Sequence, residues 1–316
     1  MRLNNKTISA RVGVGFLTLI FAPPFFSQST RLQGQQVAVS ETTATPTSRP
    51  SADHVHPFEP TEELVYVAEF SRALLKKVDV ADFRFTASRQ TPAQNIPGPA
   101  SDKDKTKDYL FKFTGDVSSK GFFAKLFNLR FREQIESLVD PASFSVTKTK
   151  RVDDQGKRSR VSETTYSDGR LRWSETDPNN PSRPPREGVA NFAGRIQDVL
   201  SAIYYLRTQP LEVGRSFELN VSDSGVVYQV PVQVVERKIK KTALGRVEVF
   251  RVDPQVFGTG RMLQEDGQFS IWITSDSRRV PVSARIKLRY GTFDITLKKV
   301  VRNPALPSVT NKNNTK

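Results

Sequence analysis

Few residues in this chain are of the types that catalyse reactions or bind metal ions. The sequence has no cysteine and two histidines, His54 and His56, which lie in a polar stretch near the N-terminus. A His-x-His pair without a third ligand binds a metal ion weakly, so we expect both histidines to be solvated in a linker. Without a later histidine there is no Ser-His-Asp triad, and without cysteine there is no thiol nucleophile.

The carboxylates form two adjacent pairs that have the wrong geometry for a catalytic dyad. Glu62 and Glu63 begin a predicted strand, and Asp153 and Asp154 lie at a predicted turn. Neighbouring side chains of an extended chain point to opposite sides, so each pair diverges. The Gly-x-Gly at residues 258–260 lacks the rest of a nucleotide-binding motif. We expect a non-enzymatic protein without metal or cofactor; a glycosidase with distant carboxylates is the enzymatic alternative.

Residues 1–29 have the pattern of a secretory signal peptide. Basic residues precede an apolar run, Val12–Phe26, and small residues follow it at Ser27 and Ser29. The run is short and contains prolines, which argues against a membrane span, with an uncleaved N-terminal anchor as the alternative. We therefore expect export to the periplasm or the extracellular space, and no disulfide to stabilise the exported chain.

The chain carries a formal net charge of +15. Export makes nucleic acid an unsuitable partner, so we expect anionic lipid, polysaccharide or an envelope protein, unless the charge simply solvates the surface. The densest positive patch surrounds a predicted hairpin turn at Asp153–Gly156, and a solvated hairpin end is the alternative interpretation. The patch consists of Lys148, Lys150, Arg151, Lys157, Arg158 and Arg160.

The elements that position these residues are mainly strands. About a dozen segments alternate apolar and polar residues with a period of two, which is typical of strands with one buried face. The clearest example is Val280–Tyr290, and short turns between such segments favour antiparallel neighbours. Residues 30–57 and 303–316 are polar and aperiodic, and we expect a disordered linker and tail on either side of one domain, 58–302.

One segment has helical periodicity. A 4-3-4-3 spacing places five apolar residues in one stripe, with Asn191 as the predicted N-cap and Pro210 ending the helix. Asp198 and Tyr205 fall on the opposite face. The stripe consists of Phe192, Ile196, Val199, Ile203 and Leu206.

Arg207 lies close to the centre of this stripe, where a charge has to be paired or reach water. Its guanidinium either extends past the edge of the core or makes a charge-assisted bond to a carboxylate on the facing sheet. Asp276 is the candidate carboxylate, in the turn that ends at Arg279; the alternative is that Asp276 caps its own turn.

This pattern predicts a mainly β fold in which a large curved antiparallel sheet, open or nearly closed into a barrel, wraps around one long amphipathic helix. A β-sandwich with a stray helix is the alternative. The helix stripe needs an apolar surface to cover it, and the sheet is the element that can supply one.

Four segments resemble a bacterial envelope family known as domain of unknown function 3108. They are Phe58–Tyr66, Asp198–Arg207, Leu211–Gly214 and Trp272–Pro281. Pro60 departs from the glycine that we expect before the acidic residue. The resemblance covers 58–302 and implies export and a β-rich domain without an assigned activity. The signature residues are Asp198, Tyr205, Arg207, Gly214, Trp272, Asp276, Arg279 and Pro281.

Two functions remain open at this point. The first is binding of a lipid-like or anionic ligand between sheet and helix. The second is a structural or scaffolding role in which the basic face contacts cell-wall polymer or a partner protein. An apolar cavity between sheet and helix would favour the first function, and a filled interior would favour the second.

Overall fold

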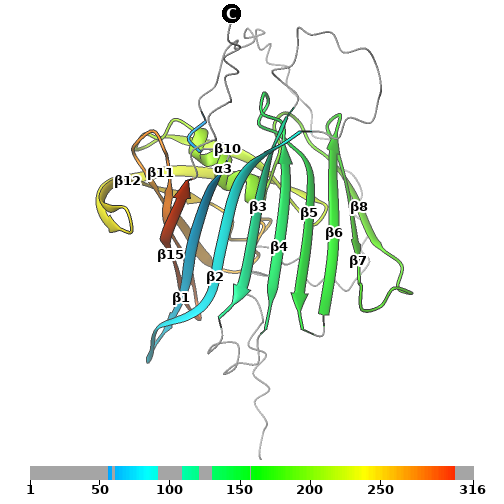
Figure 1. The fold of residues 1–316 in the computed structure, drawn as a ribbon, viewed down its shortest axis with the longest axis horizontal. Coiled ribbons are helices and arrows are strands. Elements are labelled where there is room, and N and C mark those ends of the chain that lie inside the picture. The colour runs from blue at the N-terminus through cyan, green and yellow to red at the C-terminus, as the bar shows by residue number, and fades with distance from the viewer. Residues whose placement is uncertain (1–55, 59–60, 92–108, 121–129, 157, 303–316) are drawn as a thin grey trace, which may run out of the picture.

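A computed structural model of the chain describes residues 56–58, 61–91, 109–120, 130–156 and 158–302 (Figure 1). The predicted signal peptide, the linker up to residue 55 and the tail after residue 302 lie outside these residues. Fifteen strands in the described part of the chain join in a single sheet. A mainly β fold is thereby confirmed, and the β-sandwich alternative is wrong because no second sheet forms among these strands.

The sheet is a long antiparallel meander. Its order is β8-β7-β6-β5-β4-β3-β2-β1-β15-β14-β13-β12-β11-β10-β9. The first half, in chain order, consists of β1 (Glu62–Arg72), β2 (Leu75–Gln90), β3 (Leu110–Ser119), β4 (Arg132–Val139), β5 (Val146–Gln155), β6 (Arg158–Ser167), β7 (Arg170–Thr176) and β8 (Arg186–Asn191). The second half consists of β9 (Gln197–Asp198), β10 (Ser216–Asp223), β11 (Val226–Thr242), β12 (Gly245–Pro254), β13 (Gly267–Thr274), β14 (Pro281–Leu288) and β15 (Gly291–Arg302).

The first and last strands meet in the middle of the sheet. β1 pairs with β2 on one side and with β15 on the other, so that Leu64 lies opposite both Phe85 and Val300. Because neither β1 nor β15 is an edge strand, the ends of the domain are held by full ladders of backbone hydrogen bonds. Almost every pairing is antiparallel, as expected from the short turns; β9 pairs in parallel with β10.

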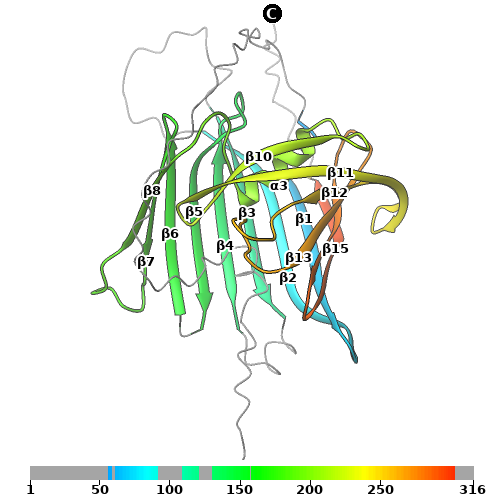
Figure 2. The ribbon, with the colours of Figure 1, turned by 180° about the vertical axis from the view of Figure 1, so that it is seen from behind.

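The sheet curls strongly but stays open, with β8 and β9 as its edges (Figures 1 and 2). The curl brings edge strand β9 to the start of β5, where the Val146 amide donates to the Ile196 carbonyl at 3.0 Å. At the other edge, Gly188 of β8 lies beside Gly225 of the β10–β11 turn, and both lie against the Trp173 ring. The two halves of the sheet thus face each other across an apolar interior.

Alternating side chains of the strands fill that interior. In β3 the buried residues are Phe111, Phe113, Gly115 and Val117, with half-buried residues between them. The Phe113 ring stacks on Tyr204 with centroids 3.9 Å apart. Phe111 and Phe113 alternate in the sequence with Leu110, Lys112 and Thr114, so the period of two corresponds to the buried face of β3.

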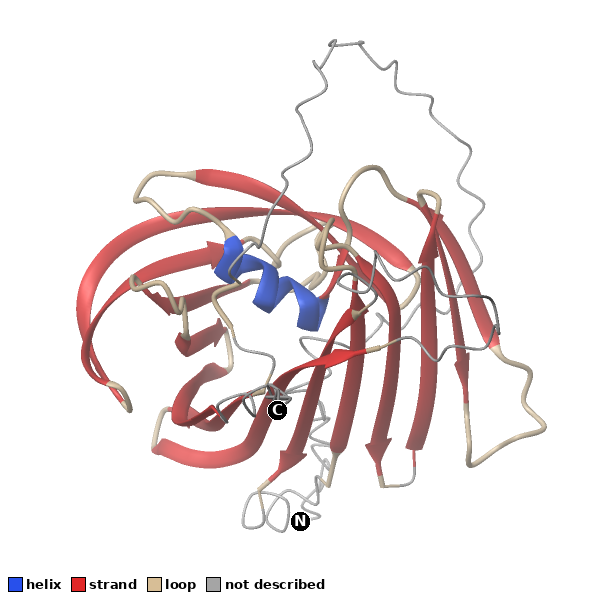
Figure 3. Ribbon diagram, turned by 45° about the horizontal axis from the view of Figure 1, so that its top comes forward, coloured by secondary structure: helices blue, strands red, loops and turns tan. Residues whose placement is uncertain are grey.

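The predicted long helix is wrong. Helix α3 (Val199–Thr208) has ten residues and lies across the concave side of the sheet (Figure 3). Asn191 ends strand β8 instead of capping a helix, and Gly194 has φ = +68°, a left-handed conformation that cannot continue a right-handed helix. Among the described residues no helix is long and apolar enough to cross a membrane.

Asp198, predicted on the outer face of the helix, is the buried N-cap. Its Oδ1 accepts from the Ser201 amide at 2.7 Å, and the Ser201 hydroxyl lies 3.0 Å from the Asp198 amide, which donates to it. Its Oδ2 accepts from Thr149 Oγ1 of β5 at 2.5 Å. This capping box satisfies the free amide groups of the first turn and links the helix to the sheet.

We expect Asp198→Ala to lower the free energy of unfolding by about 1–2 kcal/mol, because the cap of a buried helix end is lost. Asp198→Asn is the matched variant, since an asparagine oxygen can still accept from Ser201. Urea unfolding monitored by tryptophan fluorescence measures both. Equal stability of the alanine variant and the wild type would contradict this role.

Candidate functional site

An apolar cavity of about 140 Å³ lies between α3 and the concave face of the sheet. On the helix, the residues that line it are Val199, Leu200, Ala202, Ile203 and Leu206. Three of these belong to the stripe that the sequence pattern predicts, so the stripe faces a cavity rather than a packed core. The sheet contributes Tyr66, Phe83, Phe85, Gly115, Val117, Ile135, Leu219, Val221, Val230, Pro254, Phe269, Ile271, Pro281, Ser283, Ala284, Ile286 and Ile295.

Two local features keep this space open and apolar. Gly115 stands where β3 passes under the helix, and a β-carbon there would lie 3.3 Å from the Phe85 ring and 3.6 Å from Leu200. Tyr66 contributes its ring to the wall, while its hydroxyl donates to the Pro281 carbonyl at 2.8 Å. Burial raises the pKa of this hydroxyl well above its usual range. The phenol is therefore neutral and already hydrogen-bonded.

The segment between β12 and β13 covers part of the cavity. Val256, Phe257, Met262 and Leu263 line it, and Phe257 forms an isolated β-bridge with Leu263. The Leu263 amide donates to the Val256 carbonyl at 2.9 Å. The strand and helix periodicity of the sequence does not single out this segment. The available signal was the presence of four large apolar residues in an otherwise polar, glycine-containing connection.

The C-terminal end of α3 is anchored by a buried ion pair. Arg207 Nη1 lies 2.5 Å from Glu62 Oε1 in β1, and neither side chain is exposed to solvent. Arg302 of β15 donates to the second Glu62 oxygen at 2.9 Å. The remaining Arg207 Nη2 donates to the carbonyls of Pro57 and Arg278, both at 3.0 Å. These contacts join the helix to both central strands and to the chain before β1.

The bond from Arg207 to a carboxylate of the sheet is thus confirmed, but the partner is Glu62 and not Asp276. Asp276 accepts hydrogen bonds from Thr274 Oγ1 and from Arg278 Nε, each at 2.7 Å, so it stabilises its own turn. Glu63 points away from Glu62 and pairs with Arg84. The adjacent glutamates therefore diverge, as an extended strand requires.

The other signature residues occupy separate places and do not form one site. Gly214 has φ = +89° in the turn before β10, where its amide donates to the Val234 carbonyl. Arg279 also has a left-handed φ, +47°, and lies over the Phe250 ring. Trp272 packs under the Lys240 ammonium, 4.7 Å from the ring centroid. These residues shape turns and the outer face of the second half of the sheet.

Tyr205 is half-buried and lies beside Arg195, whose guanidinium donates to the tyrosine hydroxyl. His56 is also in contact with the domain, at variance with the predicted solvated linker. Its ring meets Phe111 edge to face, with centroids 4.6 Å apart. Among the described residues no group of three or more His, Asp or Glu side chains is placed to hold a metal ion.

A polar cluster adjoins the cavity at the N-terminal end of α3. Beside the Asp198 cap, the Tyr166 hydroxyl lies 2.6 Å from Ser222 Oγ. Arg151 Nε lies 2.5 Å from Glu133 Oε1, and its Nη1 lies 3.4 Å from Asp223. Ile135, Val199 and Leu200 line both this cluster and the apolar cavity. The helix is thus held at both ends by polar anchors and has apolar space beneath its middle.

Burial dominates the ionisation of this cluster. It raises the pKa of Glu133 to about 8 despite the adjacent Arg151 guanidinium, and the carboxylates of Asp153 and Asp223 raise it further. Burial also raises the pKa of Asp223 to about 6, against the opposing effect of Arg151. Few water molecules can solvate the charged forms here, so a neutral carboxyl is favoured.

The predicted basic patch is not one continuous surface. Arg151 points inward to Glu133, Arg160 pairs with the buried Glu175 at 3.3 Å, and Lys148 pairs with Glu163 at 2.9 Å. The predicted turn is also displaced, because β5 continues to Gln155. Alternate residues of a strand face opposite sides, so a run of cations along the chain is divided between the two faces. Of the rest, Lys150 is exposed, Arg158 is half-buried, and Lys157 lies outside the described residues.

Fold and cavity define the class: a mainly β protein built on one open, strongly curled sheet with one short helix over its concave side. The model of the family described as "Protein of unknown function (DUF3108)" matches residues 100–298, and the chain belongs to this family. No curated protein matches the sequence.

Two solved structures match the chain at low similarity. One is a β-barrel-like protein of domain of unknown function DUF1849 from Brucella abortus, with 8% identity, a TM-score of 0.44, and coverage of 76% of this chain and 96% of that chain. The other is a "putative lipoprotein" from Parabacteroides distasonis, with 9% identity, a TM-score of 0.27, and coverage of 79% and 100%. At these TM-scores, neither likeness defines the function of this chain.

We expect Arg207→Met to lower the free energy of unfolding by about 3–5 kcal/mol, because it leaves the Glu62 carboxylate buried without its main partner. The double variant Arg207→Met/Glu62→Met should recover most of that loss. Arg84→Met, which breaks the exposed pair with Glu63, is the control and should cost less than about 1 kcal/mol. Additive losses in a double-mutant cycle measured by urea unfolding would contradict the coupling.

Glu133 should make stability depend on pH in a defined direction. Its pKa rises from an ordinary value near 4.5 to about 8 in the folded protein. The folded state therefore holds a proton that the unfolded state releases between these values. The stabilisation is complete below about pH 4.5 and is lost as the pH rises to about 8, at up to about 1.4 kcal/mol per pH unit.

Glu133→Gln should remove this contribution, since glutamine does not titrate. Urea unfolding of the wild type and of Glu133→Gln at pH 5.5, 7 and 8.5 tests this contribution, because the two proteins share every other titrating group. Parallel pH profiles would show that Glu133 does not titrate in this range.

Proposed function

We propose that this protein is an exported, non-enzymatic envelope protein that binds a lipid-like ligand in the cavity between α3 and the sheet. The observation that supports the proposal is the cavity itself, about 140 Å³ in volume and lined almost throughout by aliphatic and aromatic side chains. A well-formed apolar cavity is the usual form of a site for an apolar molecule. The apolar run at residues 12–26 supports export.

The size of the cavity indicates how much of a ligand it takes. An apolar cavity of about 150 Å³ stays dry and binds benzene, so this one accommodates roughly six to eight carbon atoms. Leaving such a volume empty costs on the order of 3 kcal/mol of stability. A segment of an acyl chain fits the volume and the lining, and would stabilise the fold by filling it.

The lining also restricts where the polar part of the ligand lies. No charged side chain lines the cavity among the described residues. A charged group placed there would lose its hydration without a compensating partner. The ligand therefore places its hydrocarbon part under the helix and keeps any charged group outside the apolar lining.

Filling the cavity from within tests the proposal. Ala202 lies on the helix, is buried and faces the cavity, so the ring of Ala202→Phe should occupy the ligand's space. Ala142→Phe, at an exposed turn position, adds the same ring elsewhere. We expect Ala202→Phe to weaken binding of the apolar fluorophore N-phenyl-1-naphthylamine at least tenfold, and Ala142→Phe to bind like the wild type.

Native mass spectrometry of the full chain, purified without added lipid, is the second measurement. The wild type should carry adducts with lipid masses that are absent from Ala202→Phe. Unchanged fluorophore binding by a folded Ala202→Phe variant would refute the cavity as the site. Wild-type protein that is free of adducts and does not bind the fluorophore would refute the proposed function.

A further inference from the structure

The β1–β2 hairpin ends in a projecting tip, Arg72–Lys77. The adjacent strands stop short of it: β15 begins to pair with β1 at Ser71, and β3 reaches β2 no further than Ala81. The tip therefore has no lateral strand neighbours in the described sheet. Figure 1 shows the hairpin extending beyond the strands around it. Such a projection is free to meet a surface that the rest of the sheet does not touch.

Two leucines lie at the end of this tip and face solvent. Leu74 is 98% exposed and Leu75 is 42% exposed. The backbone holds them there, because Ala73 and Lys77 both adopt left-handed φ angles, +42° and +52°, that are uncommon for residues other than glycine. Exposing leucine to water is unfavourable, so the strained turn indicates a use for the exposed side chains.

Cations flank the leucines on both sides. Arg72 precedes them, and Lys76 and Lys77 follow directly. None of the three forms an ion pair with another described residue, unlike Lys148, Arg151 and Arg160 of the predicted basic patch. An apolar tip with unpaired cations is complementary to the boundary of an anionic bilayer, where aliphatic side chains enter the acyl region and cations meet lipid phosphates.

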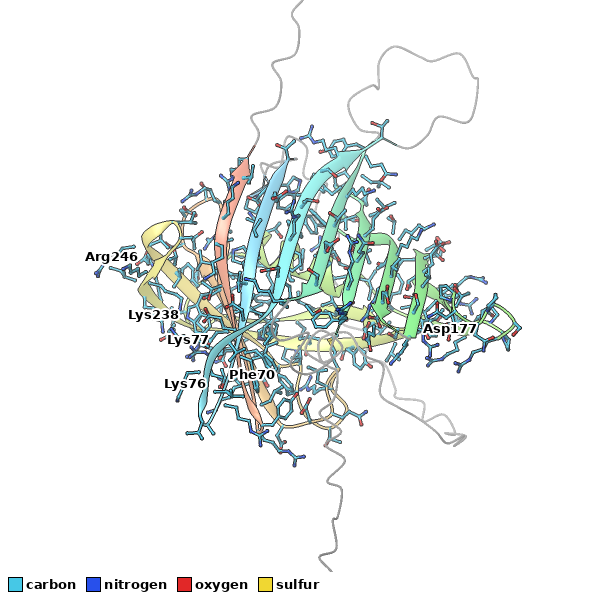
Figure 4. The ribbon with its side chains drawn as sticks, turned by 60° about the horizontal axis from the view of Figure 1, so that its bottom comes forward. Phe70, Lys76, Lys77, Asp177, Lys238 and Arg246 are labelled. Atoms are coloured by element: carbon cyan, nitrogen blue, oxygen red, sulfur yellow. The ribbon has the colours of Figure 1, made fainter. Side chains whose placement is uncertain are left out.

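The base of the tip packs closely against β15. Phe70 packs on Phe293 with ring centroids 4.6 Å apart and closes against Gly291. Figure 4 shows Lys76 and Lys77 on the side of the molecule that also carries Lys238 and Arg246, remote from Asp177. Figures 1 and 2 likewise place the β11–β12 hairpin and the β1–β2 hairpin at the same end of the long axis. That end of the molecule therefore carries Arg246 in addition to the cations of the tip, while Lys238 pairs with Glu236.

From these observations we propose that the β1–β2 tip docks the protein on an anionic lipid bilayer by inserting Leu74 and Leu75, with Arg72, Lys76 and Lys77 at the headgroups. The inference does not require a ligand in the cavity. Each lysine near an anionic surface contributes about a fivefold gain in affinity. Burial of the two leucines adds to this affinity, because it removes apolar side chains from water.

The absence of cysteine allows a site-specific test. Leu74→Cys in the full chain, labelled with an environment-sensitive fluorophore, should shift to the blue with phosphatidylcholine vesicles containing 30 mol% phosphatidylglycerol. Phosphatidylcholine alone should give no shift, and 0.5 M salt should weaken the response. Val189→Cys, labelled in the same way at an exposed position on β8, is the control, and its fluorescence should not shift. Equal responses, or none at residue 74, would overturn the proposal.

Vesicle co-sedimentation gives the energetic test. Lys76→Gln/Lys77→Gln should bind about 30-fold more weakly than the wild type. Arg170→Gln/Arg172→Gln makes the same charge change on β7 and should bind within about twofold of the wild type. Equal losses would assign binding to net charge and overturn the role of the tip. Ala202→Phe should retain vesicle binding, so that failure of the cavity proposal and failure of docking can be told apart.

Discussion

The pairing of Arg207 with Glu62 is the interaction on which the arrangement of helix and sheet depends. A buried guanidinium and a buried carboxylate are each costly alone, so the fold is stable only when the end of α3 reaches the start of β1. Arg302, in the last strand β15, forms an ion pair with the same carboxylate. One contact thus fixes the helix relative to the two strands at the centre of the sheet. A hydrophobic stripe could slide over that surface, whereas a bidentate ion pair has one geometry.

Because both ends of the helix are fixed, a cavity remains open beneath its middle. The Asp198 cap binds Thr149 at one end, and Arg207 binds Glu62 at the other. With its ends held by polar contacts, α3 cannot settle into the sheet to close the cavity below Ala202 and Ile203. Close packing elsewhere, such as the stacking of Tyr204 on Phe113, stabilises the fold and offsets the cost of this unfilled volume.

The distribution of charged groups between the surface and the interior also depends on burial. The net charge of +15 is a property of the whole chain, while the interior at the N-terminal end of α3 is rich in carboxyl groups. The Arg151 guanidinium lies there beside Glu133 and Asp223, and Asp198 caps the helix next to them. A protein that is strongly basic overall therefore has acidic groups inside, and the cations of the β1–β2 tip form no ion pair with the described residues.

The sequence by itself determined the period of most strands, the family, and the fact that Arg207 has to be paired or reach water, because these follow from side-chain spacing and the cost of burying a charge. It placed the helix end at Pro210 but began the helix too early, since Phe192 and Ile196 fit a helical stripe that the φ of Gly194 interrupts. Only the tertiary structure decided that Glu62 is the partner of Arg207, that Lys148, Arg151 and Arg160 of the basic hairpin lie beside Glu163, Glu133 and Glu175, and that the helix covers a cavity. Contacts between residues far apart in the chain depend on sheet order and curl, which local periodicity does not encode.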